Sequence, residues 1–239
     1  MNAMLAVAMI VLVVVHLLAG KLRFKTRKRR RAWLSAAGGI SVTYVFLDLL
    51  PELAEGQEVL RDRFAGLAFL EDHVYLVALA GLAGFYGVEV FVRHRRKPES
   101  RAPTSEDDWV FWIHIASFAV YNALIGYLMV EREPYEEHLP AYTVAMSLHF
   151  LVTDYGLRDH HDAIYDRKGR WVLGGAIALG YLFGMLAQVS EALVSVVAAF
   201  VAGGAILNVM KEELPEERRG QFPAFASGVV VAAILLTVT

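Results

Sequence analysis

The segment Gly38–Glu52, GGISVTYVFLDLLPE, determines how we interpret this chain, because most of it is apolar enough for a lipid bilayer and yet it carries a carboxylate. A second segment, Gly203–Glu216, reads GGAILNVMKEELPE. Each segment has a glycine pair, then an apolar helical run, then acidic residues and then Leu-Pro-Glu. The first glycine and the proline are thirteen positions apart in one segment and twelve in the other. We therefore predict that the two segments are corresponding parts of an internal repeat.

Composition indicates the class of protein. Hydrophobic residues make up 56% of the chain. They form continuous blocks of about 17–22 residues, the length of a helix that spans a bilayer. A membrane-spanning strand would need only about ten residues, with alternating polar positions. We therefore predict an all-α polytopic membrane protein in which residues 1–239 form a single transmembrane domain.

Eight transmembrane helices can be placed along the sequence. The first has no basic segment before it and no signal cleavage site, so we expect it to be retained. The predicted spans are residues 3–18, 32–50, 74–92, 109–130, 140–157, 171–189, 192–210 and 222–239.

The basic residues divide the connecting loops into two groups. Alternate loops carry twenty of the 23 Lys and Arg residues, and the opposite loops carry three. Because basic loops remain on the cytoplasmic side, we expect both termini outside, with the protein in the plasma (inner) membrane. The two repeated segments then run in opposite directions. We therefore expect helices 1–3 and 6–8 to form inverted repeats around helices 4–5.

Polar residues inside the predicted spans suggest a metal site. The chain has no cysteine, so nitrogen and oxygen atoms would have to bind any metal. In the fourth span, His114, Ser117, Tyr121 and Asn122 share one helical face; in the fifth, His149 and Asp154 lie on adjacent stripes. If these two helices are neighbours, amide, imidazole and carboxylate groups can meet in the bundle core. We predict Asn122, His149 and Asp154 as ligands of a divalent cation.

Other polar residues have simpler explanations. Asp48 and Glu89 each lie within a turn of a loop, so an interfacial position or a structural pair is favoured over a place on a cation path. His114 fits a hydrogen-bonded packing role as well as a ligand role, and His16 is predicted to lie at the membrane interface. The acidic and histidine-rich residues 159–166 are expected in an inner loop, either solvated or receiving an ion that leaves the pore.

The residues discussed so far resemble the ZIP (Zrt/Irt-like) family of divalent metal transporters. The second helix of that family commonly ends in His-Leu-Leu-Pro-Glu, and the sequence from Asp48 to Glu52 is similar, with Asp in the histidine place. The seventh helix of the family commonly carries an Ala-Gly pair and an acidic Leu-Pro-Glu end, as residues 202–216 do. The resemblance implies eight helices arranged three plus two plus three.

The metal-binding motifs of the family are altered in this chain. The fourth helix of ZIP proteins carries His-Asn-x-x-Asp-Gly, and the aligned residues of this chain are Tyr121-Asn122-Ala123-Leu124-Ile125-Gly126. The fifth helix of ZIP proteins carries a His-Glu-x-x-His-Glu type motif, of which His149 and the terminal carboxylate of Asp154 remain. The resemblance therefore implies a single-metal site in place of the usual two.

The sequence accordingly predicts a ZIP-like transporter of zinc, manganese or iron, with the divalent cation as cargo. We expect no enzyme activity, no tightly bound cofactor and no nucleic-acid partner; a homodimer is left open. The alternative is a non-transporting ZIP-like binding or scaffold protein, because Tyr121 and Ile125 would leave a drier core. An intramembrane metallo-hydrolase would need a motif such as His-Glu-x-x-His, which does not occur.

Overall fold

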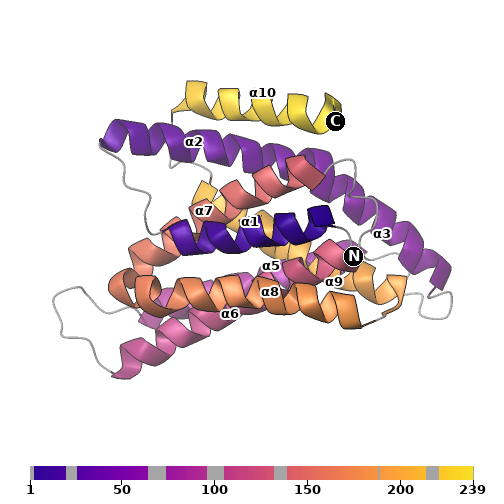
Figure 1. The fold of residues 1–239 in the computed structure, drawn as a ribbon, viewed down its shortest axis with the longest axis horizontal. Coiled ribbons are helices and arrows are strands. Elements are labelled where there is room, and N and C mark those ends of the chain that lie inside the picture. Colours follow the sequence, from indigo (N-terminus) through magenta and orange to yellow (C-terminus); the bar gives the residue numbers. More distant parts are fainter. Residues whose placement is uncertain are drawn as a thin grey trace.

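The computed structural model describes residues 3–19, 26–63, 74–95, 105–131, 139–187, 189–213 and 221–238. All regular structure in these residues is helical, which confirms the all-α part of the predicted fold class (Figure 1). The eight predicted spans correspond to eight main helices. They are α1 (Ala3–Ala19), α2 (Arg27–Tyr44) continued by α3 (Leu50–Arg63), α5 (Val74–Arg95), α6 (Ser105–Glu131), α7 (Leu139–Ile164), α8 (Arg170–Leu186), α9 (Glu191–Asn208) and α10 (Phe222–Val238).

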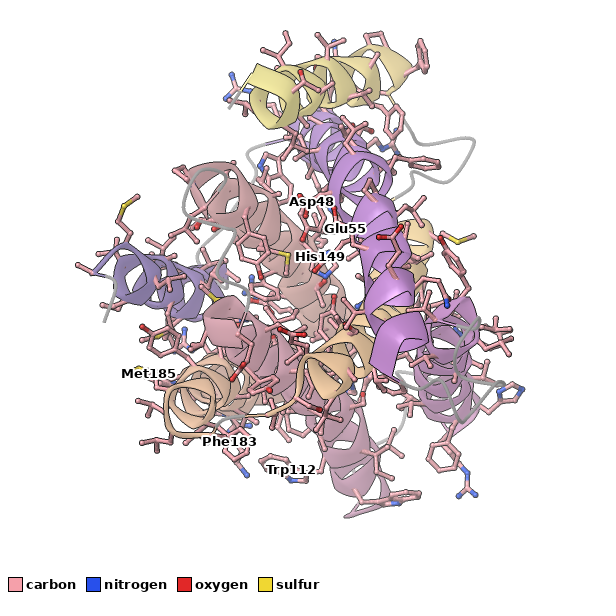
Figure 2. All side chains as sticks on the ribbon, turned by 90° about the vertical axis from the view of Figure 1, so that its right-hand side faces the viewer. Asp48, Glu55, Trp112, His149, Phe183 and Met185 are labelled. Atoms are coloured by element: carbon pink, nitrogen blue, oxygen red, sulfur yellow. The ribbon has the colours of Figure 1, made fainter. Side chains whose placement is uncertain are left out.

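The described helices make this an integral membrane protein. Five helical stretches are long and apolar enough to cross a bilayer, namely Lys28–Val59, Val74–Arg95, Trp109–Glu131, Tyr165–Leu186 and Glu191–Lys211. The apolar helices α1 and α10, of 17 residues each, are shorter. Large apolar side chains such as Phe183 and Met185 of α8 point away from the bundle, as expected for a surface that faces lipid (Figure 2).

The second helix is longer than predicted. We expected it to end at residue 50, but helical structure runs from Arg27 to Arg63. The helix passes Pro51 through a π-helical turn, η1 (Val45–Leu49), in which the amide of Leu50 donates to the carbonyl of Val45. Proline has no amide hydrogen to donate, and the wider turn rearranges the hydrogen bonds just before it without ending the helix.

The connection between the fifth and sixth spans is helical, where we expected a loop. The helix α7 continues to Ile164 and is followed directly by a π-helical turn, η3 (Tyr165–Gly169), and then by α8. This stretch contains no proline, and its first glycine after Gly156 is Gly169. Figure 1 shows that the chain nevertheless reverses direction here, because α8 returns beneath α1.

The helices form two layers. In layer A, α1 packs against both α7 and α8, and α8 packs extensively against α6. In layer B, α2 packs against α10, α9 against α5, and α3 against α9. Fewer contacts join the layers, chiefly α2 with α7 and both α5 and α9 with α6. Figure 2, viewed along the helices, shows layer A and layer B as two adjacent rows. The central helices α6 and α7 therefore belong to the same layer as α1 and α8.

Close backbone contacts in layer B depend on glycine. At the contact of α2 with α10, a Cβ on Gly39 would overlap the carbonyl oxygen of Phe225. In return, a Cβ on Gly228 would overlap the carbonyl oxygen of Ala36. Only glycine permits so short a distance between two helix backbones.

The contact of α9 with α5 has the same arrangement. A Cβ on Gly203 would overlap the carbonyl oxygen of Ala78, and a Cβ on Gly81 would overlap that of Phe200. The helix α9 also ends in a π-helical turn, η4 (Val209–Glu213), as α2 does.

The two contacts are equivalent residue by residue. Residue numbers differ by 164 between Ala36 and Phe200, Gly39 and Gly203, the turns Val45–Leu49 and Val209–Glu213, and the prolines 51 and 215. They differ by 147 between Phe225 and Ala78 and between Gly228 and Gly81. Gly39, not Gly38, is thus the counterpart of Gly203, which removes the one-residue mismatch in the sequence comparison. Residues 214–220, and with them the second proline, lie outside the described part of the chain.

Candidate functional site

A cavity lies between the two layers near the ends of the helices that carry Glu52 and Tyr142. Its volume, measured as the space open to the centre of a water molecule, is about 40 Å³, enough for a few waters. Layer B contributes α2, η1, α3 and α9, and layer A contributes α6 and α7. The lining residues are Tyr44, Leu49, Glu52, Tyr121, Ile125, Leu128, Tyr142, Met146, Ala198, Val201 and Ala205. We call this the outer cavity, because it lies near the helix ends that are joined by the loops poor in basic residues.

The wall of the outer cavity is mostly apolar, with a few polar groups. Glu52 supplies a carboxylate, and Tyr44 and Tyr142 face each other across the layers with ring centres 6.2 Å apart. Ile125 and Tyr121, which the sequence comparison aligns with two metal ligands of the ZIP motif, line this wall. This wall is drier than a multi-ligand metal site would be.

His149 lies directly behind this wall. The hydroxyl of Tyr121 is 3.3 Å from Nε2 of His149, and both side chains are buried, with 1% and 5% exposed. Figure 2 shows His149 in the interior of the bundle, where α7 faces the continuous helix of Asp48. The Tyr121–His149 pair therefore separates the outer cavity from the inner half of the protein.

Asn122, the residue that follows Tyr121 on α6, is also buried. Its Nδ2 donates to the carbonyl of Phe118 at 2.8 Å. Its Oδ1 has no hydrogen-bond partner among the described residues, although the side chain is only 1% exposed. A buried amide oxygen without a partner is costly, and it could accept a proton donor or a cation.

Asp154 makes a different kind of contact. Its carboxylate binds Nδ1 of His16 on α1, with distances of 2.8 and 2.9 Å, and both side chains are completely buried. The ring of Phe150 stacks on His16, with centres 4.6 Å apart. The prediction that His16 lies at the interface is therefore wrong. It lies within the last turn of α1, but α7 and α8 cover that turn.

The three predicted ligands thus have three separate partners. His149 and Asp154 are five residues apart on α7, which places them about 140° apart around the helix axis. Within the described ranges, no group of three or more His, Asp or Glu side chains is arranged to hold a metal ion. A metal bound by all three predicted residues would require Asp154 to leave His16.

A second polar cluster lies at the opposite end of the bundle and also joins the layers. Glu89 of α5 is 2.7 Å from Nζ of Lys211 in η4 and 3.2 Å from Nε2 of His114 in α6. Nδ1 of His114 is 2.9 Å from Nε2 of His161 in α7, and Arg93 reaches Glu89 at 3.4 Å. Glu89 therefore has ion-pair partners within the protein, as the structural-pair interpretation expected. Sequence reasoning missed Lys211 as its partner, because the two residues are distant in sequence and the contact depends on packing of α5 against α9.

This second end carries basic residues and aromatic rings typical of a membrane–water interface. Cationic groups lie over aromatic rings in several pairs: Arg30 over Tyr155, Arg95 over Phe91 and Trp109, Lys168 over Trp112 and Arg170 over Trp171. Basic residues and amphipathic aromatic rings concentrate at such interfaces. We call this the inner end. The side chains of residues 159, 160, 162 and 163 lie outside what the structure describes.

The sequence matches no protein-family description, and no curated protein is similar to it. The likeness to ZIP transporters accordingly rests on the sequence motifs alone.

Proposed function

We propose that this protein is a ZIP-like membrane transporter of a divalent metal cation such as zinc, manganese or iron. The observation that carries the proposal is the position of the outer cavity, at the meeting point of the second and seventh spans with the fourth and fifth. Inverted-repeat transporters bind their substrates at the interface of their repeats. The matching glycine contacts and π turns, at a constant numbering difference of 164, support a 3+2+3 inverted repeat with eight crossings.

In this proposal the cation enters the outer cavity past Glu52 and reaches His149 and Asn122 behind Tyr121. Asp154 would hold His16 and stabilise layer A, and would bind the cation only after releasing that partner. The packing favours movement of layer A against layer B, because contacts within each layer are more extensive than contacts between them. In such a movement α1 and α8 would move together with the central helices α6 and α7.

The basic and aromatic inner end supports the expected orientation, with both termini outside and the inner end in the cytoplasm. The two marked chain ends lie in the same half of Figure 1, as an even number of crossings requires. A plasma (inner) membrane location is part of the same proposal.

Cation uptake into proteoliposomes tests the proposal. We expect His149→Ala to reduce initial uptake of zinc or manganese at least about tenfold, because the imidazole is the ligand nearest the outer cavity. His94→Ala is the matched control, since His94 is exposed and contacts the carbonyl of Val90 on its own helix. If uptake by the unmodified protein equals that of protein-free vesicles, the protein is not a transporter.

That result would favour a second candidate, a non-transporting ZIP-like binding or scaffold protein. The observation behind it is that His149 and Asp154 already have protein partners, Tyr121 and His16. Calorimetric titration with zinc, manganese and iron separates the two candidates. Binding no tighter than about millimolar would support the scaffold.

A further inference from the structure

The cluster at the inner end surrounds a second, smaller cavity. Its volume, by the same measure as the outer one, is about 10 Å³, room for a single water molecule or ion. The polar lining groups come from three helices and a π turn. The lining residues are Phe85, Val88, Glu89, His114, Ser117, Phe118, Leu207, Asn208 and Lys211.

Two groups in this cavity contact each other directly, at a distance that two ligands of one cation would also have. Oε2 of Glu89 and Nε2 of His114 are 3.2 Å apart. Ligands bound at about 2.0–2.1 Å in tetrahedral geometry lie roughly 3.3 Å from each other. The carboxylate and the imidazole are almost completely buried, with 6% and 2% exposed.

Asn208 supplies an independent observation. It lines the same cavity and is 4% exposed, and its Nδ2 has no hydrogen-bond partner among the described residues. Turning the amide over would place the carbonyl oxygen where the nitrogen now lies, because the two ends of an amide have nearly the same shape. A buried amide that lacks a partner indicates that the cavity accommodates a further polar species.

Lys211 pairs with the carboxylate of Glu89. Its ammonium group lies 2.7 Å from Oε1 of Glu89, so it neutralises a carboxylate that would otherwise be costly inside the protein. Its side chain is 19% exposed, and it therefore has access to solvent at the inner end. A lysine of this length can withdraw toward water when another cation reaches the carboxylate.

We propose that Glu89, His114 and Asn208 form a divalent-cation site at the inner end, and that Lys211 takes the place of the cation when the site is empty. The ligands are one carboxylate, one imidazole and one amide oxygen, and waters would complete the shell. This donor set suits zinc or manganese. The site lies on α5, α6 and α9, separate from Asn122, His149 and Asp154. It extends the proposed cation path to the inner end, but binding at this site does not depend on transport.

Zinc titration of the purified protein in lipid nanodiscs tests the inference by calorimetry, with manganese titration followed by electron paramagnetic resonance as a second probe. Lys211→Ala should bind zinc at least about tenfold more tightly at one site, because the competing cation is removed. Glu89→Gln should lose one binding event. His94→Ala, which changes an exposed histidine on the same helix as Glu89, should match the unmodified protein.

The response of Lys211→Ala distinguishes binding from a structural role, since loss of a purely structural ion pair would not tighten binding of zinc. If Glu89→Gln does not fold, Asn208→Ala replaces it, with an expected loss of about tenfold in affinity. Unchanged or weaker zinc binding by Lys211→Ala would overturn the proposal. Zinc binding by Glu89→Gln, or by Asn208→Ala in its place, that equals binding by the unmodified protein would overturn it as well. Failure of uptake in vesicles, with these binding results intact, would reject the transport function and leave the inner site.

Discussion

Within the described part of the chain, two histidine–carboxylate pairs can be compared, and they differ in what they join. His16 and Asp154 connect two helices of layer A, both are completely buried, and the ring of Phe150 packs against His16. His114 and Glu89 connect layer A to layer B, next to a cavity and a lysine that reaches solvent. The first pair holds two helices of layer A together as long as it is intact. The second lies where the layers would separate, so the same chemistry can take part in binding and movement.

The largest loss of stability should follow removal of the carboxylate from the buried His16–Asp154 pair. Asp154→Ala leaves His16 buried without its partner, which we expect to cost about 3–5 kcal/mol of stability. The apparent melting temperature of the purified protein measures this. The double change His16→Leu, Asp154→Leu should recover most of the loss, because it removes both polar groups together. An unchanged melting temperature for Asp154→Ala would mean that the pair contributes little and that Asp154 is available as a ligand.

A smaller effect should come from packing inside layer B. Gly81→Ala places a Cβ against the carbonyl oxygen of Phe200, and we expect a loss of about 1–3 kcal/mol as α5 and α9 move apart. Gly84→Ala, one turn further along the same helix, is the matched control, since a Cβ there meets no atom within 4 Å. Equal thermal stability of the two variants would show that α5 and α9 are not in close contact.

The smallest effects should come from the cations that surround Glu89. Lys211→Met should cost about 1 kcal/mol, because His114 still contacts the carboxylate and part of the lysine is in solvent. Arg93→Gln should cost less than about 0.5 kcal/mol, since the arginine side chain is 66% exposed and 3.4 Å from Glu89. Chemical denaturation of the two variants side by side ranks them. A larger loss for Arg93→Gln would mean that the cluster depends on its exposed cation.

Much of the fold followed from local patterns in the sequence. Continuous apolar blocks predicted the helices. The repeated glycines and Leu-Pro-Glu sequences identified the two segments that make matching contacts, α2 with α10 and α9 with α5. The pattern could not predict that helix α2 continues past Pro51, because a proline usually marks an end and a π turn leaves no sequence signal of its own. The helical connection between α7 and α8 was missed because its charged residues also fit a loop.

The candidate sites were harder to predict, because their geometry depends on which helices are neighbours. Asn122, His149 and Asp154 were chosen for their residue types, and their helices do lie in one layer. The spacing on α7 nevertheless directs His149 to Tyr121 and Asp154 to His16. Glu89 and Lys211 are 122 positions apart in the sequence, and nothing local to either residue indicates the other.

The constant numbering difference within layer B has an energetic consequence. In the proposed inverted repeat, exchanging the conformations of the two halves would convert a form open to one side of the membrane into a form open to the other side. Interactions that are the same in both halves therefore cancel in the free-energy difference between the two forms. The remainder arises where equivalent positions differ in chemistry. By the same numbering, Lys211 corresponds to Leu47 and Glu89 to Leu236. The ion pair has leucines as its counterpart, so in the proposed transporter it would favour a form closed at the inner end. Neutralising Glu89, by substitution or by a bound cation, should move the population toward the opposite form.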